Sequence, residues 1–141
     1  MSELVVHVFR LDGLLTAAGD AMAAPAGQTS ARWRVLAAIE DAPLTVPQVA
    51  RAWWLSRQSV QRVANELADE GLAAYEDNPG HRRSKLLRIT PTGASALRAI
   101  REAQRAWADE LGAEIGEAEL RTANSTLSGV VEAVARREPA G

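Results

Sequence analysis

The stretch LSRQSVQRVANELADEGL, residues 55–72, predicts a helix that begins at a serine and ends at a glycine. Ser56 is a side chain that commonly caps a helix N-terminus, and Gly71 stands where glycine commonly ends a helix. Four apolar residues recur at i, i+3, i+4 and i+7 and so share one face, which we expect to enter the core: Val60, Val63, Ala64 and Leu67. We therefore predict a helix over residues 56–70.

The opposite face of this helix is polar and basic. Arginine offers a two-pronged donor to guanine, glutamine and asparagine offer a matching pair of groups to adenine, and serine reaches bases or phosphates. The outward residues are Ser56, Arg57, Gln58, Ser59, Gln61, Arg62 and Asn65. Their types suit contact with DNA, although exposed arginines can also lie on an ordinary solvated face.

A short helix precedes this one. Thr45 and Gln48 have the spacing of a capping box, and Pro47 falls in the first turn, where a missing N–H is tolerated. This helix should run to about Trp53, followed by a tight turn into Ser56. A short helix, a tight turn and a longer helix form a helix-turn-helix, in which the longer helix lies in the major groove.

A small basic hairpin follows. Residues 72–75 and 86–89 are apolar and flank the turn sequence Asn78-Pro79-Gly80. Its tip carries Arg82, Arg83 and Lys85, which a narrow minor groove or flanking phosphates would attract. The competing interpretation is that Arg82 or Arg83 pairs with Asp77. Residues 51–88 hold seven basic and five acidic residues, whereas the whole chain has a net charge of −2.

The two ends of the chain carry heptad stripes. Apolar residues recur at alternating steps of four and three from Leu4 to Met22, and similar stripes run from Leu97 to Leu111 and from Leu120 to Val134. These exceed what a small core needs, so we predict that helices at about 2–24 and 91–137 pair two chains into a homodimer. A further short helix is expected from about Ser30 to Asp41. We expect one domain over residues 1–141, with the winged helix-turn-helix at about 29–90.

Composition excludes several classes of function. The 141 residues contain no cysteine and two histidines, so disulfides, cysteine nucleophiles and a histidine-rich metal site are not expected. Neither a catalytic triad nor a glycine-rich phosphate loop is present. No apolar run is long enough to cross a membrane, and the N-terminus lacks a secretion signal. The sequence predicts a cytoplasmic protein that is not an enzyme and has no cofactor or metal.

Three stretches carry a resemblance to a known family: ARWRVLAAI at 31–39, the recognition stretch at 55–72, and NPGHRRSKLLRITPTG at 78–93. Together they resemble transcription regulators of the MarR (multiple antibiotic resistance regulator) family. The fold class implied is mainly α with a small β-hairpin, a winged helix-turn-helix flanked by N- and C-terminal dimerisation helices. The resemblance also implies a dimeric regulator, predicted here to be a repressor, that binds a pseudo-palindromic operator in double-stranded DNA. A small aromatic or anionic ligand often releases such regulators.

The resemblance places the recognition helix at 56–70 and the wing at 75–87. The residues expected to bind DNA are Ser56, Arg57, Gln58, Ser59, Gln61, Arg62, Arg82, Arg83 and Lys85. This chain departs from the family at His81, where many members carry an acid, and at Gly80, where others carry an arginine. It also has Trp54 where glycine is usual. A bulky residue is strained at positive φ, so we expect the turn to adopt another conformation.

A ligand site is predicted from a histidine, an arginine and three tryptophans: His7, Arg10, Trp33, Trp53 and Trp54. His7 and Arg10 could receive a carboxylate, and an aromatic ligand could stack on a tryptophan. The alternatives are a dimer-edge histidine and tryptophans that belong to the core, as the stripes containing Trp33, Trp53 and Trp107 favour. The alternative for the whole chain is a winged-helix protein–protein interaction module without DNA binding.

Overall fold

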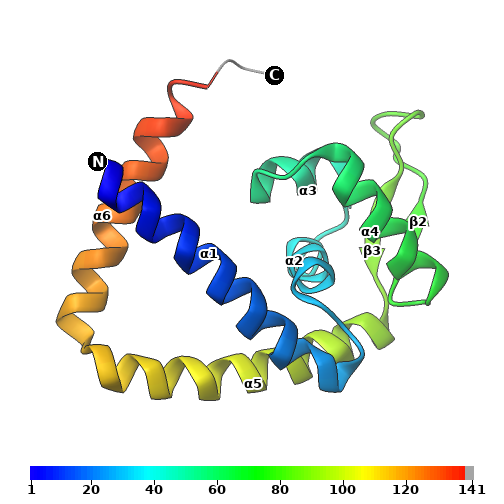
Figure 1. Cartoon of the computed structure of the whole chain (residues 1–141). Coiled ribbons are helices and arrows are strands. Elements are labelled where there is room, and N and C mark those ends of the chain that lie inside the picture. The colour runs from blue at the N-terminus through cyan, green and yellow to red at the C-terminus, as the bar shows by residue number, and fades with distance from the viewer. Residues whose placement is uncertain (139–141) are drawn as a thin grey trace. The chain divides into compact units, whose positions relative to one another are not determined.

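The computed structural model describes residues 1–138 as a mainly helical chain with one small sheet (Figure 1). The helices are α1 (Ser2–Ala23), α2 (Ser30–Ala38), α3 (Val46–Trp53), α4 (Arg57–Asp69), α5 (Pro91–Ile115) and α6 (Glu117–Ala135), with a 3-10 turn η1 (Ala24–Ala26). The strands are β1 (Leu44–Thr45), β2 (Ala73–Glu76) and β3 (Leu86–Ile89). The chain forms two compact units that divide within α5, between Gln104 and Arg105. Residues 139–141 of the domain expected from the sequence lie outside the described part.

The first unit holds a core assembled from its helices and sheet. The predicted stripe of α4 is buried as expected, and it meets buried residues of α2, α3, β3 and α5. The largest fully buried side chains are Leu36, Ile39, Leu67, Leu87, Leu97, Ile100, Val35, Val49 and Val60. Each contributes roughly 1.5–3 kcal/mol through removal of its surface from water. This core fixes α3, α4 and the sheet as one lobe.

The sheet has three antiparallel strands in the order β1-β3-β2, so the predicted hairpin gains a third strand. Tyr75 pairs with Leu87 in the hairpin, and Thr45 pairs with Leu86 on the other edge of β3. Strand β1 was not predicted, because two residues are too few to show an alternating pattern. The extra strand ties the start of α3 to the wing.

The wing is also anchored to α5. The Thr90 hydroxyl donates to the Gly71 carbonyl at 2.6 Å and accepts from the Gly93 N–H at 3.1 Å. A Cβ on Gly93 would lie 2.0 Å from the Leu72 carbonyl oxygen, so only glycine fits where α5 begins. The base of the hairpin is therefore held rigidly against the core.

Helix α1 joins the lobe at its C-terminal end. Ser30 donates its backbone N–H to the Asp20 carboxylate at 2.7 Å and its hydroxyl to the Thr16 carbonyl at 2.8 Å. Gly19 lies against Ser30, and a Cβ there would come within 2.3 Å of the Ser30 hydroxyl. One ion pair, between Asp12 and Arg34 at 3.9 Å, adds a further link between α1 and α2.

Much of the apolar surface on the terminal helices is exposed. On α1 the large exposed apolar residues are Val5, Val6, Val8, Phe9, Leu11, Leu14 and Leu15. The second unit contains the end of α5 and α6, joined at Gly116 with a φ of 101°. It exposes Leu111, Ile115, Leu120, Val131 and Val134, and α6 has no buried residue. Within residues 1–138, no helix combines the length and apolar character needed to span a membrane.

Candidate nucleic-acid interface

Both helices of the predicted helix-turn-helix are capped as the sequence indicates. Thr45 accepts from the Gln48 N–H at 3.3 Å, and the Gln48 side chain accepts from the Thr45 N–H at 2.8 Å. Ser56 accepts from the Ser59 N–H at 3.1 Å and begins α4. These caps satisfy amide groups that helix starts leave without partners, and they fix where the first turn of α4 presents its side chains.

The turn between α3 and α4 differs from the expectation for Trp54. Trp54 adopts the left-handed conformation, with φ 52° and ψ 41°, so the prediction of another turn geometry is wrong. A non-glycine residue in this region costs on the order of 1–3 kcal/mol. The conformation lets the Trp54 and Leu55 N–H groups donate to Arg51 and Ala50 carbonyls at 3.3 and 2.9 Å, which ends α3.

The two arginines predicted on α4 have different surroundings. Arg57 is exposed and forms no ion pair with any residue in 1–138. Arg62 forms an i,i+4 ion pair with Glu66 at 2.6 Å. In the free chain, Arg57 is thus the arginine on α4 whose guanidinium is available.

Glu66 also belongs to a clamp between α2 and α4. Arg32, on α2, contacts Glu66 at 3.4 Å and Glu70 at 2.5 Å. The hydrogen bond from Arg32 lowers the pKa of Glu70, and the same bond raises the pKa of Arg32. The clamp attaches the C-terminal half of α4 to α2, at the opposite end of α4 from its exposed first turn.

The wing carries free basic side chains at its tip. Asn78 accepts from the Gly80 N–H at 3.0 Å, and the His81 and Ser84 N–H groups make further turn bonds. Arg82 and Arg83 are exposed, and no ion pair links either to Asp77 among the residues described. Below the tip, Arg88 pairs across the strands with Glu76 at 3.1 Å. The alternative interpretation, an ion pair of Asp77 with Arg82 or Arg83, does not occur among the described residues.

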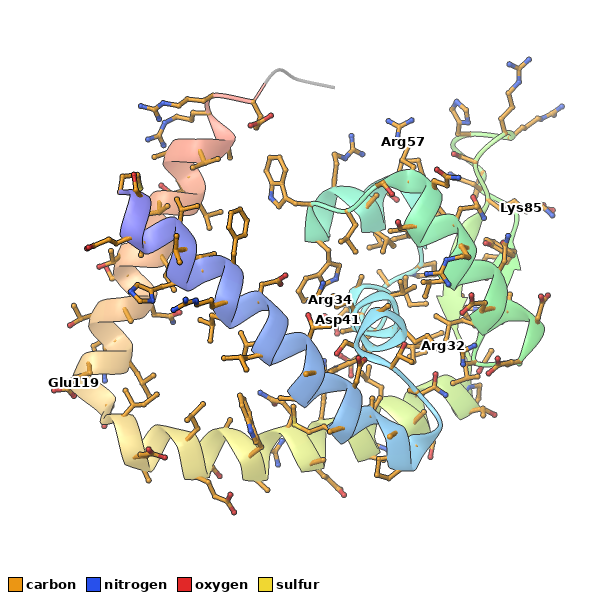
Figure 2. The ribbon with its side chains drawn as sticks, viewed as in Figure 1. Arg32, Arg34, Asp41, Arg57, Lys85 and Glu119 are labelled. Carbon is orange, nitrogen blue, oxygen red and sulfur yellow. The ribbon has the colours of Figure 1, made fainter. Side chains whose placement is uncertain are left out.

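A cleft lies between the recognition helix and the wing. Its volume is about 370 Å³, and its lining is Val46, Pro47, Arg57, Gln58, Gln61, Arg83, Ser84 and Lys85. Three of these side chains are cations and none is an acid. Figure 2 shows Arg57 and Lys85 at the same end of the lobe, with Arg32 at the other end of α4. Positive charge from α4 and the wing, apart in sequence, is brought together here.

A polar network joins α4 to β2 beside this cleft. The Gln61 amide donates to the Tyr75 hydroxyl at 2.8 Å and to Asn65 Oδ1 at 3.0 Å, and Tyr75 donates to the same Oδ1 at 2.7 Å. Partial burial raises the pKa of Tyr75. Sequence reasoning did not single out Tyr75. The only signal was strand alternation, which puts it on the same face as the buried Ala73.

The residues predicted to bind a ligand are spread over α1, α2, the end of α3 and the turn that follows α3. His7 and Arg10 are exposed on α1, and Trp33 is half-buried against the core from α2. Trp53 is 43% exposed and Trp54 67% exposed, so the core interpretation holds for Trp33 but is wrong for Trp53. None of the five residues lines the cationic cleft.

Comparison with known proteins places this lobe in a family. A model of the MarR family matches residues 26–84, which span α2, the helix-turn-helix and most of the wing. The chain belongs to the MarR family. It is 40% identical over 139 residues to an uncharacterized protein of Mycobacterium tuberculosis, covering 99% of this chain and 97% of that one. A second relative, from Thauera aromatica and named for transcriptional regulation of the hcr operon, is 29% identical over 113 residues, covering 79% of this chain and 66% of that one.

Solved structures of MarR-family regulators share the fold. The MarR family transcription regulator SP03579 superposes with a TM-score of 0.85 at 24% identity, covering 96% of this chain and 90% of that one. A mutant of E. coli MarR in complex with operator DNA gives 0.83 at 19% identity, with 91% and 93% covered. The protein is thus a MarR-family transcription regulator with a DNA-binding winged helix.

Proposed function

We propose that this MarR-family regulator is a homodimeric repressor that binds a pseudo-palindromic operator through recognition helix 56–70 and wing 75–87. The observation that carries the proposal is the convergence of Arg57, Arg83 and Lys85 on one cleft that no acid lines. Cations held together without counter-charges attract phosphate and lower the free energy of DNA binding by releasing counterions.

The residues divide by the contact that each can make. We assign Arg57, in the exposed first turn of α4, to a guanine in the major groove, with Gln58 beside it. Arg62 forms an ion pair with Glu66, so its guanidinium is only partly available to DNA. We assign Arg62 to a phosphate contact. The wing residues Arg82, Arg83 and Lys85 contact the minor groove or its phosphates. Ser56, Ser59 and Gln61 complete the α4 surface proposed to face DNA.

Dimerisation is proposed through the terminal helices, at about 2–24 and 91–137. Its support is the exposed apolar surface of α1 and, separately, of the second unit, which a single chain leaves in water. Two recognition helices related by a two-fold axis would read half-sites about 34 Å apart. We propose that the regulator acts in the cytoplasm.

An effector is the last part of the proposal. A small anionic or aromatic molecule would bind near His7, Arg10, Trp33, Trp53 and Trp54. Exposed aromatic side chains at Trp53 and Trp54 support this, because they offer a stacking surface. To release DNA, the ligand must favour a lobe arrangement that does not fit the operator, since equal affinity for both arrangements shifts nothing.

Footprinting on the DNA beside the protein's own gene tests the proposal. We expect two protected half-sites whose centres lie about one helical turn apart, and higher transcription from a linked reporter when the protein is removed. Absence of a footprint, together with capture of a specific protein through the α4 surface, would favour the interaction module instead.

A further inference from the structure

The amide of Asn65 is oriented by two neighbours. Its Oδ1 accepts from the Tyr75 hydroxyl at 2.7 Å and from the Gln61 amide at 3.0 Å. An amide oxygen has two lone pairs, so these two donors use its accepting capacity. The Nδ2 group, with two donor hydrogens, bonds to no other residue within 1–138. Asn65 therefore offers its surroundings donors only.

Asn65 lies on the surface of α4 that faces away from the core. The buried positions Val60, Val63, Ala64 and Leu67 define the opposite face, and Asn65 is exposed two turns after Gln58. Tyr75 is half-buried on β2, which packs against α4. Asn65 thus lies on the same exposed surface of α4 as Gln58, and its oxygen is already bonded to Gln61 of α4 and to Tyr75 of the wing.

We propose that Tyr75 locks the Asn65 amide so that Asn65 selects guanine, and not adenine, at one base pair of each half-site. The inference rests on the proposed operator binding. Adenine presents the acceptor N7 beside the donor N6 in the major groove, and asparagine reads that pair with both its oxygen and its NH₂. Guanine presents two acceptors, N7 and O6, which suit a group that only donates.

Tyr75 acts here as a positioning residue and touches no base. Replacing Tyr75 with phenylalanine keeps the ring and removes the hydroxyl, which frees one lone pair on Asn65 Oδ1. Gln61 alone then holds the amide, which can rotate and present its oxygen to the groove. Preference for guanine should fall at this one base pair, while the contacts of Arg57 stay as they are.

The test is a base-pair scan of the footprinted operator. Asn65→Ala identifies the base pair: it is the position at which the wild-type chain has a base preference and the variant has none. At that position the wild-type chain should bind guanine about tenfold more tightly than adenine, and Tyr75→Phe should reduce the ratio to about threefold or less. Replacing the guanine with 7-deazaguanine should weaken wild-type binding, because N7 is removed.

Two further variants make the test specific. Gln58→Ala is the matched control on the same surface and should change preference at a different base pair, leaving the guanine preference intact. Asn65→Asp keeps an acceptor for Tyr75 but presents no donor, so it should abolish the guanine preference even if Tyr75→Phe folds poorly. A thermal melt of each variant separates loss of fold from loss of discrimination.

The outcomes separate this inference from the proposed function. Specific operator binding with adenine preferred at the Asn65 position, or a guanine preference that Tyr75→Phe and Asn65→Asp leave unchanged, would overturn the inference alone. Failure of the wild-type chain to distinguish its operator from shuffled DNA would overturn both.

Discussion

The interior of the winged helix and the apolar faces of the terminal helices hold the same kinds of side chain in opposite environments. Leu36, Leu67 and Leu87 are fully buried, whereas Phe9 is 73% exposed, Leu14 68% and Val131 57%. The winged helix buries these apolar side chains within one chain. The terminal helices leave side chains in water, each of which would contribute roughly 1.5–3 kcal/mol if buried. The lobe thus buries its apolar side chains without a partner. The exposed apolar faces of the terminal helices suit contact with another surface, which we propose to be a second copy of the chain.

The largest effect is expected inside the lobe. Leu67→Ala removes a fully buried side chain from α4 and should lower the free energy of unfolding by about 2–5 kcal/mol, through lost burial and the cavity that remains. Chemical denaturation measures this directly. The matched control, Leu14→Ala, truncates an exposed leucine and should cost less than about 1 kcal/mol at concentrations where the chain is monomeric. Equal costs would show that the two regions do not differ as described.

A charge on the apolar face of the terminal helices should prevent dimerisation and leave the winged-helix lobe folded. Leu11→Glu on α1 combined with Leu127→Glu on the apolar stripe of α6 is expected to give a folded monomer in light scattering. Operator affinity should fall at least about 100-fold, because two half-sites no longer act together. Circular dichroism checks that helix content is kept. A dimer that persists in the double variant would refute the assignment of these helices to the interface.

Trp54 tests the cost of the turn between the helices. Trp54→Gly should stabilise the isolated chain by about 1 kcal/mol, because glycine adopts positive φ without strain and the exposed indole loses little packing. Thermal melts at one protein concentration measure the change. A destabilised variant would mean that the indole packs in a way that its exposure does not reveal.

The smallest effect is a pH dependence from the clamp on α4. Glu70 has a lowered pKa because Arg32 donates to it, so its contribution to stability is present above its usual pKa of 4.5 and is lost as pH falls through the lowered value. Glu70→Gln should flatten the acid side of the stability curve. Glu102→Gln, which removes the charge of an exposed glutamate in the middle of α5, is the matched control for the substitution itself.

Features set by nearby residues could be predicted from the sequence. The caps at Thr45 and Ser56, the end of α4 at Gly71 and its buried stripe depend on spacings within one or two turns, and all are confirmed. The basic character of α4 and the wing could also be predicted from the sequence, because residue types and turn residues are enough to show it.

What could not be predicted depends on residues far apart in the chain. The Arg32 clamp spans 34 and 38 positions, and the Tyr75 bond to Asn65 spans 10 across a change from helix to strand. The left-handed Trp54 was mispredicted because local preference argues against it, yet the chain ends α3 that way. The two hydrogen bonds that end α3 outweigh the unfavourable conformation of Trp54.

We propose that the cleft lined by Arg57, Arg83 and Lys85 binds specific DNA. Fluorescence anisotropy with the DNA beside the gene and with a shuffled control, over a salt series, tests it most directly. We predict specific binding that weakens steeply with salt, a loss of about 1–3 kcal/mol for Arg57→Ala at one base pair per half-site, and no loss for Arg98→Ala, an exposed arginine on α5. Equal, weak binding to both DNAs that Arg57→Ala leaves unchanged would mean that the cleft does not recognise an operator.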